Sequence, residues 1–134
     1  MDGEYIIKIS PDKEMVKSIL SMVEIRELRI KETNREKFVS LLVEDYYEVV
    51  KELATSIMNL DGYKTLSHKE LFIWIKKRYS EFTDEVINII NNLRTTRNNV
   101  VYEGFFVKEH YLAKKLEVID GVIFKLKSIV KRKL

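Results

Sequence analysis

Apolar residues recur every three or four positions in several segments of the chain, which is the period of an amphipathic α-helix. The clearest pattern predicts a helix that ends near Asn59, with an apolar face made of Phe38, Leu41, Leu42, Tyr46, Val49, Val50, Leu53 and Ile57. A second strong pattern, near the end of the chain, is made of Leu112, Leu116, Ile119, Ile123, Leu126 and Val130. We expect these two helices to form the centre of the fold.

The first helix is predicted to begin at Ser10 and Pro11, because serine is a favoured N-cap and proline fits the first helical turn. It should run to about Lys31 and pack through Met15, Ile19, Met22, Val23 and Leu28. Residues 5–9 favour extended structure by their composition. We therefore expect residues 1–9 to be a short N-terminal arm, either a strand or disordered.

Two further helices are predicted from their capping residues. Ser67 and Glu70 form a capping-box pattern at the start of a short helix. Thr83 precedes a fourth helix, after which a loop is expected around residues 99–106. Five helices with short connections predict an all-α fold, an up-and-down helical bundle that forms one domain over residues 1–134.

Composition indicates the class of protein but says little about its function. Hydrophobic residues make up 46% of the chain and charged residues 34%, the balance of a soluble globular protein. The absence of cysteine excludes a disulfide framework and a thiolate nucleophile. No apolar run is long enough to span a membrane and no signal-peptide pattern is present, so we expect a cytoplasmic protein without a membrane partner. Scarce glycine and proline with abundant lysine and glutamate suit a thermophilic source.

Arg97 is the most unusual residue in these patterns. The apolar face of the fourth helix is formed by Val86, Ile89, Ile90 and Leu93. A step of about 100° per residue places Arg97 on the same face. Because an unpaired buried charge is very costly, its guanidinium needs an acidic partner.

Asp45, at the edge of the apolar face of the second helix, is the predicted partner of Arg97 in a bidentate ion pair, with Arg94 turned more toward solvent. Such a pair is either part of a ligand site or a purely structural link that fixes the helix register.

The segment 97–102, Arg-Asn-Asn-Val-Val-Tyr, follows Leu-Arg-Thr-Thr at 93–96 and resembles the signature of the HEPN superfamily. HEPN domains are small all-α proteins whose signature is an arginine, often followed by asparagine or another polar residue, and then a histidine a few residues later. The acidic stretch 45–50 and the turn at 60–64 resemble the corresponding parts of archaeal members. The resemblance covers roughly residues 38–130 and implies a HEPN-like helical bundle.

Carried over residue by residue, the resemblance makes Arg97 the family arginine and Asn98 the polar residue after it, while Tyr102 stands at the histidine position. In members that resemble metal-independent ribonucleases, the arginine would hold the scissile phosphate and the histidine would transfer the proton. Arg97 and Tyr102 are thus the candidate catalytic residues, and Arg94, Arg97, Asn98 and Tyr102 the candidate ligand-binding residues. A tyrosine, with an ordinary pKa of about 10, is a poor general base at neutral pH, so the resemblance supports binding better than catalysis.

The chain contains two histidines. His68 lies in the capping-box turn, far from Arg97 in sequence, and is expected to be a solvated helix-start residue. His110 is an alternative catalytic partner of Arg97. The histidines show no metal-ligand spacing with carboxylates, so no metal is predicted, and the lone Gly104 is no phosphate-binding loop, so no cofactor is predicted. Gly104 is instead expected to adopt a positive φ in the turn after the fourth helix.

Several aromatic residues add expectations about burial. Tyr46 and Tyr47 are adjacent, so only one is expected to face inward, and Tyr47 is expected to be the exposed one. Phe105 and Phe106 are expected to plug the end of the bundle, or alternatively to line a dimer interface.

Three functions fit these residues. The leading hypothesis is a HEPN-like binding module for a nucleotide, an RNA or a nucleotidyltransferase partner of the toxin–antitoxin kind, as the resemblance implies. The alternatives are a metal-independent endoribonuclease that uses Arg97 with Tyr102 or His110, and a purely structural or interaction protein. A homodimer is expected, because the family commonly builds its groove between two copies. The helices also carry spare aromatic residues: Phe72, Trp74, Tyr79 and Phe105.

Overall fold

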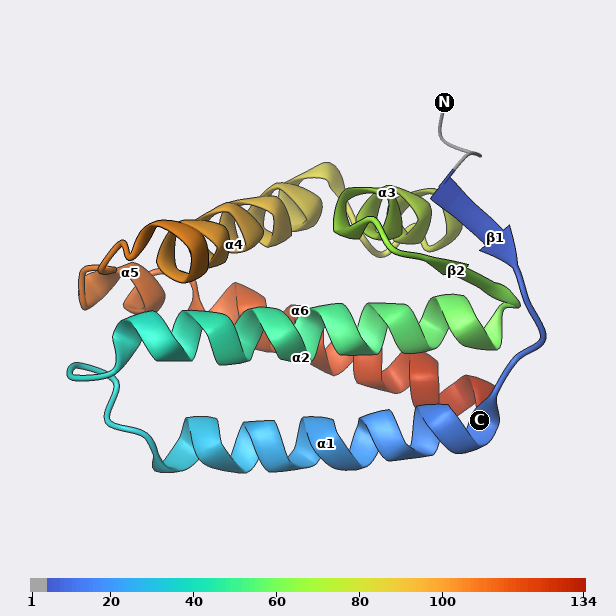
Figure 1. The fold of residues 1–134 in the computed structure, drawn as a ribbon, viewed down its shortest axis with the longest axis horizontal. Helices are drawn as coiled ribbons and strands as arrows, with labels where there is room; N and C mark the ends of the chain where they lie inside the picture. Colours follow the sequence, from blue (N-terminus) through green and yellow to red (C-terminus); the bar gives the residue numbers. More distant parts are fainter. Residues whose placement is uncertain (1–4) are drawn as a thin grey trace.

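The computed structural model of the protein describes residues 5–134, in which six α-helices and two short β-strands form (Figure 1). In chain order the elements are β1 (Ile6–Lys8), α1 (Lys13–Glu32), α2 (Val39–Leu60), β2 (Tyr63–Thr65), α3 (His68–Arg78), α4 (Asp84–Glu103), α5 (His110–Ala113) and α6 (Leu116–Lys133). The predicted all-α helical bundle is thereby confirmed. Residues 1–4 of the expected N-terminal arm lie outside the described residues.

Helix α2 lies at the centre of the bundle. It packs against α1, α3, α4 and α6, with α1 along one side and α6 behind it in the view of Figure 1. Apolar residues surround much of α2, and those buried include Leu42, Val49, Val50, Leu53 and Ile57. The prediction that the second helix and the last long helix pack at the centre is therefore correct, although Phe38 and Leu41 near the start of α2 are exposed.

The strands β1 and β2 form a small antiparallel sheet in which Ile6 pairs with Thr65. The backbone N–H of Ile9 continues this contact by donating to the carbonyl of Gly62 at 2.8 Å. Gly62 has a φ of +91°, and a Cβ at this position would lie 3.3 Å from the carbonyl oxygen of Ile9. A glycine therefore suits the turn for both its backbone conformation and its closeness to the arm. The expected arm is thus a strand, and its partner β2 is too short to show a sequence period.

Helix α1 begins later and packs differently than predicted. Its N-cap is Asp12 and not Ser10, because the Asp12 carboxylate accepts a hydrogen bond from the backbone N–H of Met15 at 3.0 Å. The backbone N–H of Asp12 donates to the side chain of Asn59 at 2.8 Å, which ties the start of α1 to the end of α2. The buried residues of α1 are Val16, Val23 and Ile30. Three of the residues expected in the core are exposed instead: Met15, Met22 and Leu28.

The predicted caps of α3 and α4 are confirmed. The hydroxyl of Ser67 accepts a hydrogen bond from the backbone N–H of Glu70 at 3.2 Å, and that of Thr83 accepts one from Val86 at 3.3 Å. The Ser67 cap makes His68 the first residue of α3. The cap therefore fixes the position of His68 in the first turn of α3.

The last helices differ from the prediction at two places. Helix α4 continues to Glu103, so the segment 99–103 is helical rather than a loop, and Gly104 ends it with a φ of +66°, the positive value expected. The single long helix expected after residue 110 is two helices, α5 and α6, separated by a turn at Lys114 and Lys115. The apolar face continues across this break, with Leu112, Ile119, Ile123, Leu126 and Val130 buried.

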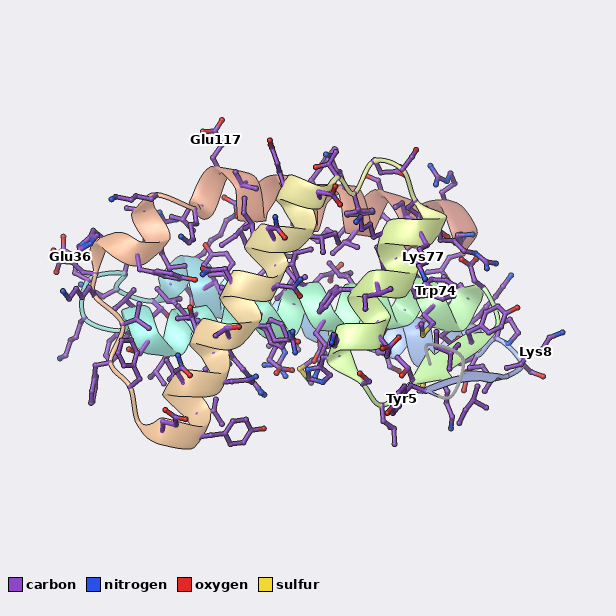
Figure 2. All side chains as sticks on the ribbon, turned by 90° about the horizontal axis from the view of Figure 1, so that it is seen from above. Tyr5, Lys8, Glu36, Trp74, Lys77 and Glu117 are labelled. Atoms are coloured by element: carbon purple, nitrogen blue, oxygen red, sulfur yellow. The ribbon has the colours of Figure 1, made fainter. Side chains whose placement is uncertain are left out.

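Figure 2 shows α3 and α4 lying across α2, with Trp74 labelled on α3. The Trp74 ring lies 6.1 Å from that of Tyr63 and 6.5 Å from that of Tyr79. Phe72, Trp74 and Tyr79 are all buried, so the expectation that these three aromatic residues are available for a dimer surface is wrong. None of the helices in residues 5–134 has the length and apolar character needed to cross a membrane.

Candidate functional site

Arg97 lies where α4 packs against α2. Its side chain is 17% exposed, and its Nη2 donates to Oε1 of Glu48 at 3.1 Å. The other carboxylate oxygen of Glu48 accepts a hydrogen bond from Nζ of Lys51 at 2.7 Å. Burial would raise the pKa of Glu48, but the hydrogen bond from Lys51 and the charges of Lys51 and Arg97 outweigh burial and lower it. Glu48 is therefore ionised at neutral pH and holds both cations in place.

The predicted ion pair between Asp45 and Arg97 is wrong. Asp45 lies toward α1, where its carboxylate pairs with Arg29, whose Nε lies at 3.0 Å, and comes within 3.8 Å of Arg26. An acid from α2 does neutralise Arg97, as the cost of burying the guanidinium requires. That acid is Glu48, which lies three residues after Asp45 and belongs to the side of α2 that α4 covers.

The guanidinium of Arg97 lies near two tyrosine rings. Its Cζ is 5.6 Å from the ring centroid of Tyr47 and 5.8 Å from that of Tyr102, both within the range of cation–π attraction. Nη1 of Arg97 donates to the side-chain oxygen of Asn98 at 3.1 Å. The ring of Tyr102 is 73% exposed. The structure thus brings Arg97, Asn98 and Tyr102 together and leaves Tyr102 open to solvent.

Arg94 is half-buried rather than turned out to solvent. Within the described part of the chain it pairs with no carboxylate, and the Nε atoms of Arg94 and Arg97 are buried there without a hydrogen-bond partner. Two arginines on one side of α4 therefore have N–H groups for which the described residues provide no hydrogen-bond acceptor. The Nη groups of Arg94 form no hydrogen bond within the described residues and are the ones that an acceptor from a ligand can engage.

Sequence reasoning missed two members of this site, Tyr47 and His68. Tyr47 is fully buried, contrary to the expectation that it is exposed, and Tyr46 beside it is buried as well. The Tyr47 hydroxyl and Nδ1 of His68 form a hydrogen bond of 2.8 Å. His68 is half-buried rather than solvated. No spacing in the sequence links the two residues, which lie on different helices, so only the packing of α3 on α2 reveals the contact.

The environment of His68 favours its neutral form. Burial lowers the pKa of His68, and the positive charges of Lys51, Arg97 and Arg94 lower it further, while Glu48 acts in the opposite direction. Burial raises the pKa of Tyr47 well above its usual value, so the phenol keeps its proton. His68 and Lys51 also line a cavity of about 260 Å³. Glu52 lines this cavity as well, and a neutral imidazole that faces it is able to accept a proton from a bound molecule.

His110 belongs to a different part of the molecule. It is exposed at the start of α5 and lines a cavity together with Thr96 and Asn99 of α4. Thr96 follows Arg94 by two residues, about 200° around the helix, so this cavity opens on another side of α4 from Arg94. The structure therefore places the two alternative partners of Arg97 apart, with Tyr102 beside the guanidinium and His110 at a separate cavity.

Phe105 and Phe106, which follow α4, do not plug the end of the bundle. Phe105 is 54% exposed and Phe106 is 86% exposed. Val101 and Tyr102, in the last turn of α4, are exposed too, and of these four residues Tyr102 is the one that lies against Arg97. Of the four spare aromatic residues expected on the helices, Phe105 alone is exposed, and Phe106, the other alternative interface residue, is exposed as well.

Cations outnumber carboxylates around Arg97. Arg26, Lys51, Arg94 and Arg97 contribute four positive charges to this part of the molecule, and Glu48 and Glu52 contribute two negative charges. Among residues 5–134 no group of three or more histidine, aspartate and glutamate side chains is placed to hold a metal ion. Comparison of the chain with protein-family models, curated proteins and solved structures gave no match.

Proposed function

We propose that this protein is a HEPN-like binding module that holds a phosphate group of a nucleotide or an RNA at Arg94, Arg97, Asn98 and Tyr102. The observation that carries the proposal is the arrangement of Arg94 and Arg97, two arginines beside a single carboxylate, with Arg94 unpaired within residues 5–134. A guanidinium presents several N–H donors in a plane and binds phosphate through paired hydrogen bonds.

The two arginines have different roles in this proposal. Arg97 is held by Glu48, so its position is set before a ligand arrives, and part of the entropy of ordering the side chain is already lost in the free protein. Arg94 is free to donate to a phosphate oxygen. Tyr102 offers an exposed ring on which a base can stack. Because a tyrosine stands at the usual histidine position of the family, the module binds without efficient catalysis.

The resemblance also implies a homodimer and, as a partner, a nucleotidyltransferase of a toxin–antitoxin system. Exposed residues near the end of α4 supply a contact surface for either partner: Val101, Tyr102 and Phe106. Large exposed apolar patches on a folded protein commonly mark interaction surfaces. Light scattering of the purified protein distinguishes a monomer from a dimer, and Phe106→Asp should shift a dimer toward the monomer.

Binding is tested with a fluorescent single-stranded RNA and with AMP at low salt, using the wild type and three variants. Arg94→Ala should weaken RNA binding by roughly tenfold, and the slope of affinity against salt should fall by about one phosphate contact. Arg132→Ala, an exposed arginine at the end of α6, is the matched control and should leave affinity nearly unchanged. Tyr102→Ala separates stacking from charge. Equal affinity of Arg94→Ala and wild type would refute the proposal.

A second candidate function, a metal-independent endoribonuclease, is favoured by one observation. His68, and not His110, is the histidine near Arg97, and when its Nδ1–H donates to the Tyr47 oxygen, Nε2 of the neutral imidazole is available to accept a proton from a ribose 2′-hydroxyl. Arg97 and Arg94 would then neutralise the charge on the phosphate. This function uses the same cations as the binding proposal and adds one proton acceptor.

Cleavage of structured and single-stranded RNA in the presence of EDTA tests the second function. His68→Gln should abolish cleavage while RNA affinity remains close to wild type, whereas His110→Gln should change neither. Tyr102→Phe keeps the ring but removes the hydroxyl. If cleavage survives in Tyr102→Phe and is lost in His68→Gln, His68 is the proton acceptor. If the wild type releases no product, or His68→Gln cleaves as fast as the wild type, the catalytic role is excluded.

A further inference from the structure

We propose that the cavity between α4 and α5 is a second binding site, separate from Arg97, that takes a mononucleotide with its phosphate on lysines and its base on Phe105. The cavity has a volume of about 440 Å³, within the range of pockets that hold small molecules. It is formed by the C-terminal half of α4, the loop after Gly104 and the short helix α5, which lie at one end of the bundle (Figure 1).

Positive charge dominates the walls of this cavity. Lys108, Lys114, Lys115 and His110 line it, and no aspartate or glutamate does. Within residues 5–134, none of the three lysines forms an ion pair with a carboxylate. The chain as a whole has 24 basic and 21 acidic residues, so a cavity with three unpaired lysines and no acid is a local departure from balance. An anion that enters it meets no competing carboxylate.

The aromatic residues of the cavity have different roles. The ammonium of Lys115 lies 4.7 Å from the ring centroid of Tyr111, so one face of this ring is already used. The Tyr111 hydroxyl donates to the side-chain oxygen of Asn92 on α4 at 2.7 Å, and burial raises its pKa. Tyr111 therefore anchors α5 to α4 and positions Lys115. Phe105, with its ring half exposed, is the surface on which a base can stack.

Polar groups complete the wall on the α4 side. Thr96 and Asn99 line the cavity, and both are only partly exposed. The Thr96 hydroxyl donates to the carbonyl of Asn92 at 3.0 Å and can only accept from a ligand, whereas the Asn99 amide is able to donate and accept at the edge of a base or at a sugar hydroxyl. The loop is held in place as well, since the backbone N–H of Val107 donates to the hydroxyl of Ser40 on α2 at 2.8 Å. The combination of cations, an open ring and an amide matches a nucleotide better than inorganic phosphate alone.

This site does not depend on the function proposed for Arg97. The α4 residues that line the cavity are Thr96 and Asn99, and neither Arg94 nor Arg97 is among the lining residues. Different substitutions therefore remove the two sites. An Arg94→Ala protein lacks the charge of the first site and keeps every lysine of the second.

The experiment measures AMP binding by NMR and calorimetry in the Arg94→Ala background, where the first site is weakened. AMP should shift the amide signals of residues 105–115 and of Asn99. The triple variant Lys108→Gln, Lys114→Gln, Lys115→Gln should weaken AMP binding about tenfold or more, because three cations near one phosphate are removed. The matched control replaces two exposed α6 lysines, Lys125→Gln and Lys131→Gln, and should retain full affinity.

Two further probes define the ligand chemistry. Adenosine should bind much more weakly than AMP if the lysines hold the phosphate, and Phe105→Ala should weaken AMP without changing the weak binding of inorganic phosphate if the ring holds the base. All lysine substitutions are at the surface or partly exposed, and thermal melts verify that the variants fold. The inference is overturned if AMP leaves the signals of residues 105–115 unchanged, or if the triple variant binds AMP as tightly as the α6 control.

Discussion

The hydroxyl of Tyr47 and Nδ1 of His68 are hydrogen-bonded at 2.8 Å, which joins the centre of α2 to the first turn of α3. Glu48, the residue after Tyr47, holds Arg97, so one turn of α2 contacts the catalytic candidates of both α3 and α4. The phenol fixes the orientation of the imidazole, while burial and the cations around it favour its neutral form. His68 therefore reports on the electrostatics of the whole site.

The pKa of His68 should lie below the ordinary value of 6.5, because burial and then the charges of Lys51 and Arg97 disfavour the imidazolium. NMR titration of the imidazole signals measures it, with His110→Gln used to assign them. Lys51→Gln should raise the pKa of His68 toward 6.5, and a bound phosphate should raise it also, since the anion offsets the cations. A pKa in Lys51→Gln equal to or lower than that of the wild type would contradict this electrostatic account.

The same shift makes folding stability depend on pH. The folded protein binds the His68 proton less tightly than the unfolded chain, whose histidine titrates near 6.5. The contribution of His68 to stability is therefore complete above about pH 6.5 and is lost as pH falls from there to the lower pKa of the folded state. Urea denaturation at several pH values should show a steeper decline over this window in the wild type than in His68→Gln. Parallel pH profiles of the two proteins would rule out this linkage.

The ion pair of Glu48 and Arg97 should stabilise the bundle as well as position the guanidinium. Arg97→Ala leaves Glu48 partly buried without its α4 partner, and we expect a loss of about 2 kcal/mol in the free energy of unfolding, less than for a fully buried pair. Arg94→Ala is the control, because Arg94 has no carboxylate partner in residues 5–134. Denaturant melts give both values, and the double variant Glu48→Ala, Arg97→Ala isolates the coupling between the two residues.

This comparison also separates a structural role from a binding role. If Arg97→Ala lowers stability while Arg94→Ala leaves stability unchanged and weakens RNA binding, the site both holds the bundle and binds a ligand. Should neither variant alter binding, with the stability loss confined to Arg97→Ala, Arg97 would serve the packing of α4 on α2 alone.

The error over Asp45 shows what a sequence pattern cannot provide. Helical periodicity predicted that Arg97 faces α2 and needs an acid from it, and both statements are correct. Periodicity does not determine the axial offset between two helices or the side to which a residue at the edge of an apolar face turns. Three residues correspond to about 4.5 Å along a helix and to a rotation of about 60°, which here is enough to separate Asp45, held by Arg29, from Glu48.

Caps and glycines were more predictable than packing faces. Ser67, Thr83 and Gly104 act locally, through hydrogen bonds or backbone conformation within one turn, so their neighbours in sequence are enough to identify them. The face of α1 was misjudged because methionines, an isoleucine and a leucine surround much of this helix. Only the position of α2 decides that Val16 and Val23 are buried and that Met15 and Met22 are not.

The glycines provide a test of backbone conformation with an internal control. Gly104→Ala should destabilise the protein by about 1 kcal/mol, because φ is +66° and no neighbouring atom would contact the added methyl group. Gly62→Ala should cost more, because its Cβ would also press on the carbonyl of Ile9 at 3.3 Å. Gly121→Ala, within α6 and in open space, should instead stabilise by roughly 0.5–1 kcal/mol. Thermal melts rank the three, and a stabilising Gly104→Ala would mean that the left-handed C-cap is not formed in solution.

Asp61, at the end of α2, should be the point that attaches the last turn of α6 to the bundle. Its carboxylate accepts hydrogen bonds from Nζ of Lys133 at 2.6 Å and from the hydroxyl of Tyr79 at 2.7 Å. The hydrogen bond with Asp61, followed by that with Tyr79, raises the pKa of Lys133, so this lysine stays charged throughout the neutral range. Lys133→Met should therefore lower the free energy of unfolding by about 1–2 kcal/mol, as expected for one hydrogen bond to a charged group that remains partly solvated.

Lys131→Met is the matched control for this prediction, because Lys131 lies in the same last turn but is exposed. Its effect should stay within about 0.5 kcal/mol. High salt should reduce the difference between the two variants by screening the pair. Amide hydrogen exchange gives a second measurement, since loss of Lys133 should speed exchange in the last turn of α6 and leave the middle of that helix protected. Equal stability of Lys133→Met and Lys131→Met would show that the packing of Ile129 and Val130 is enough to hold α6 in place.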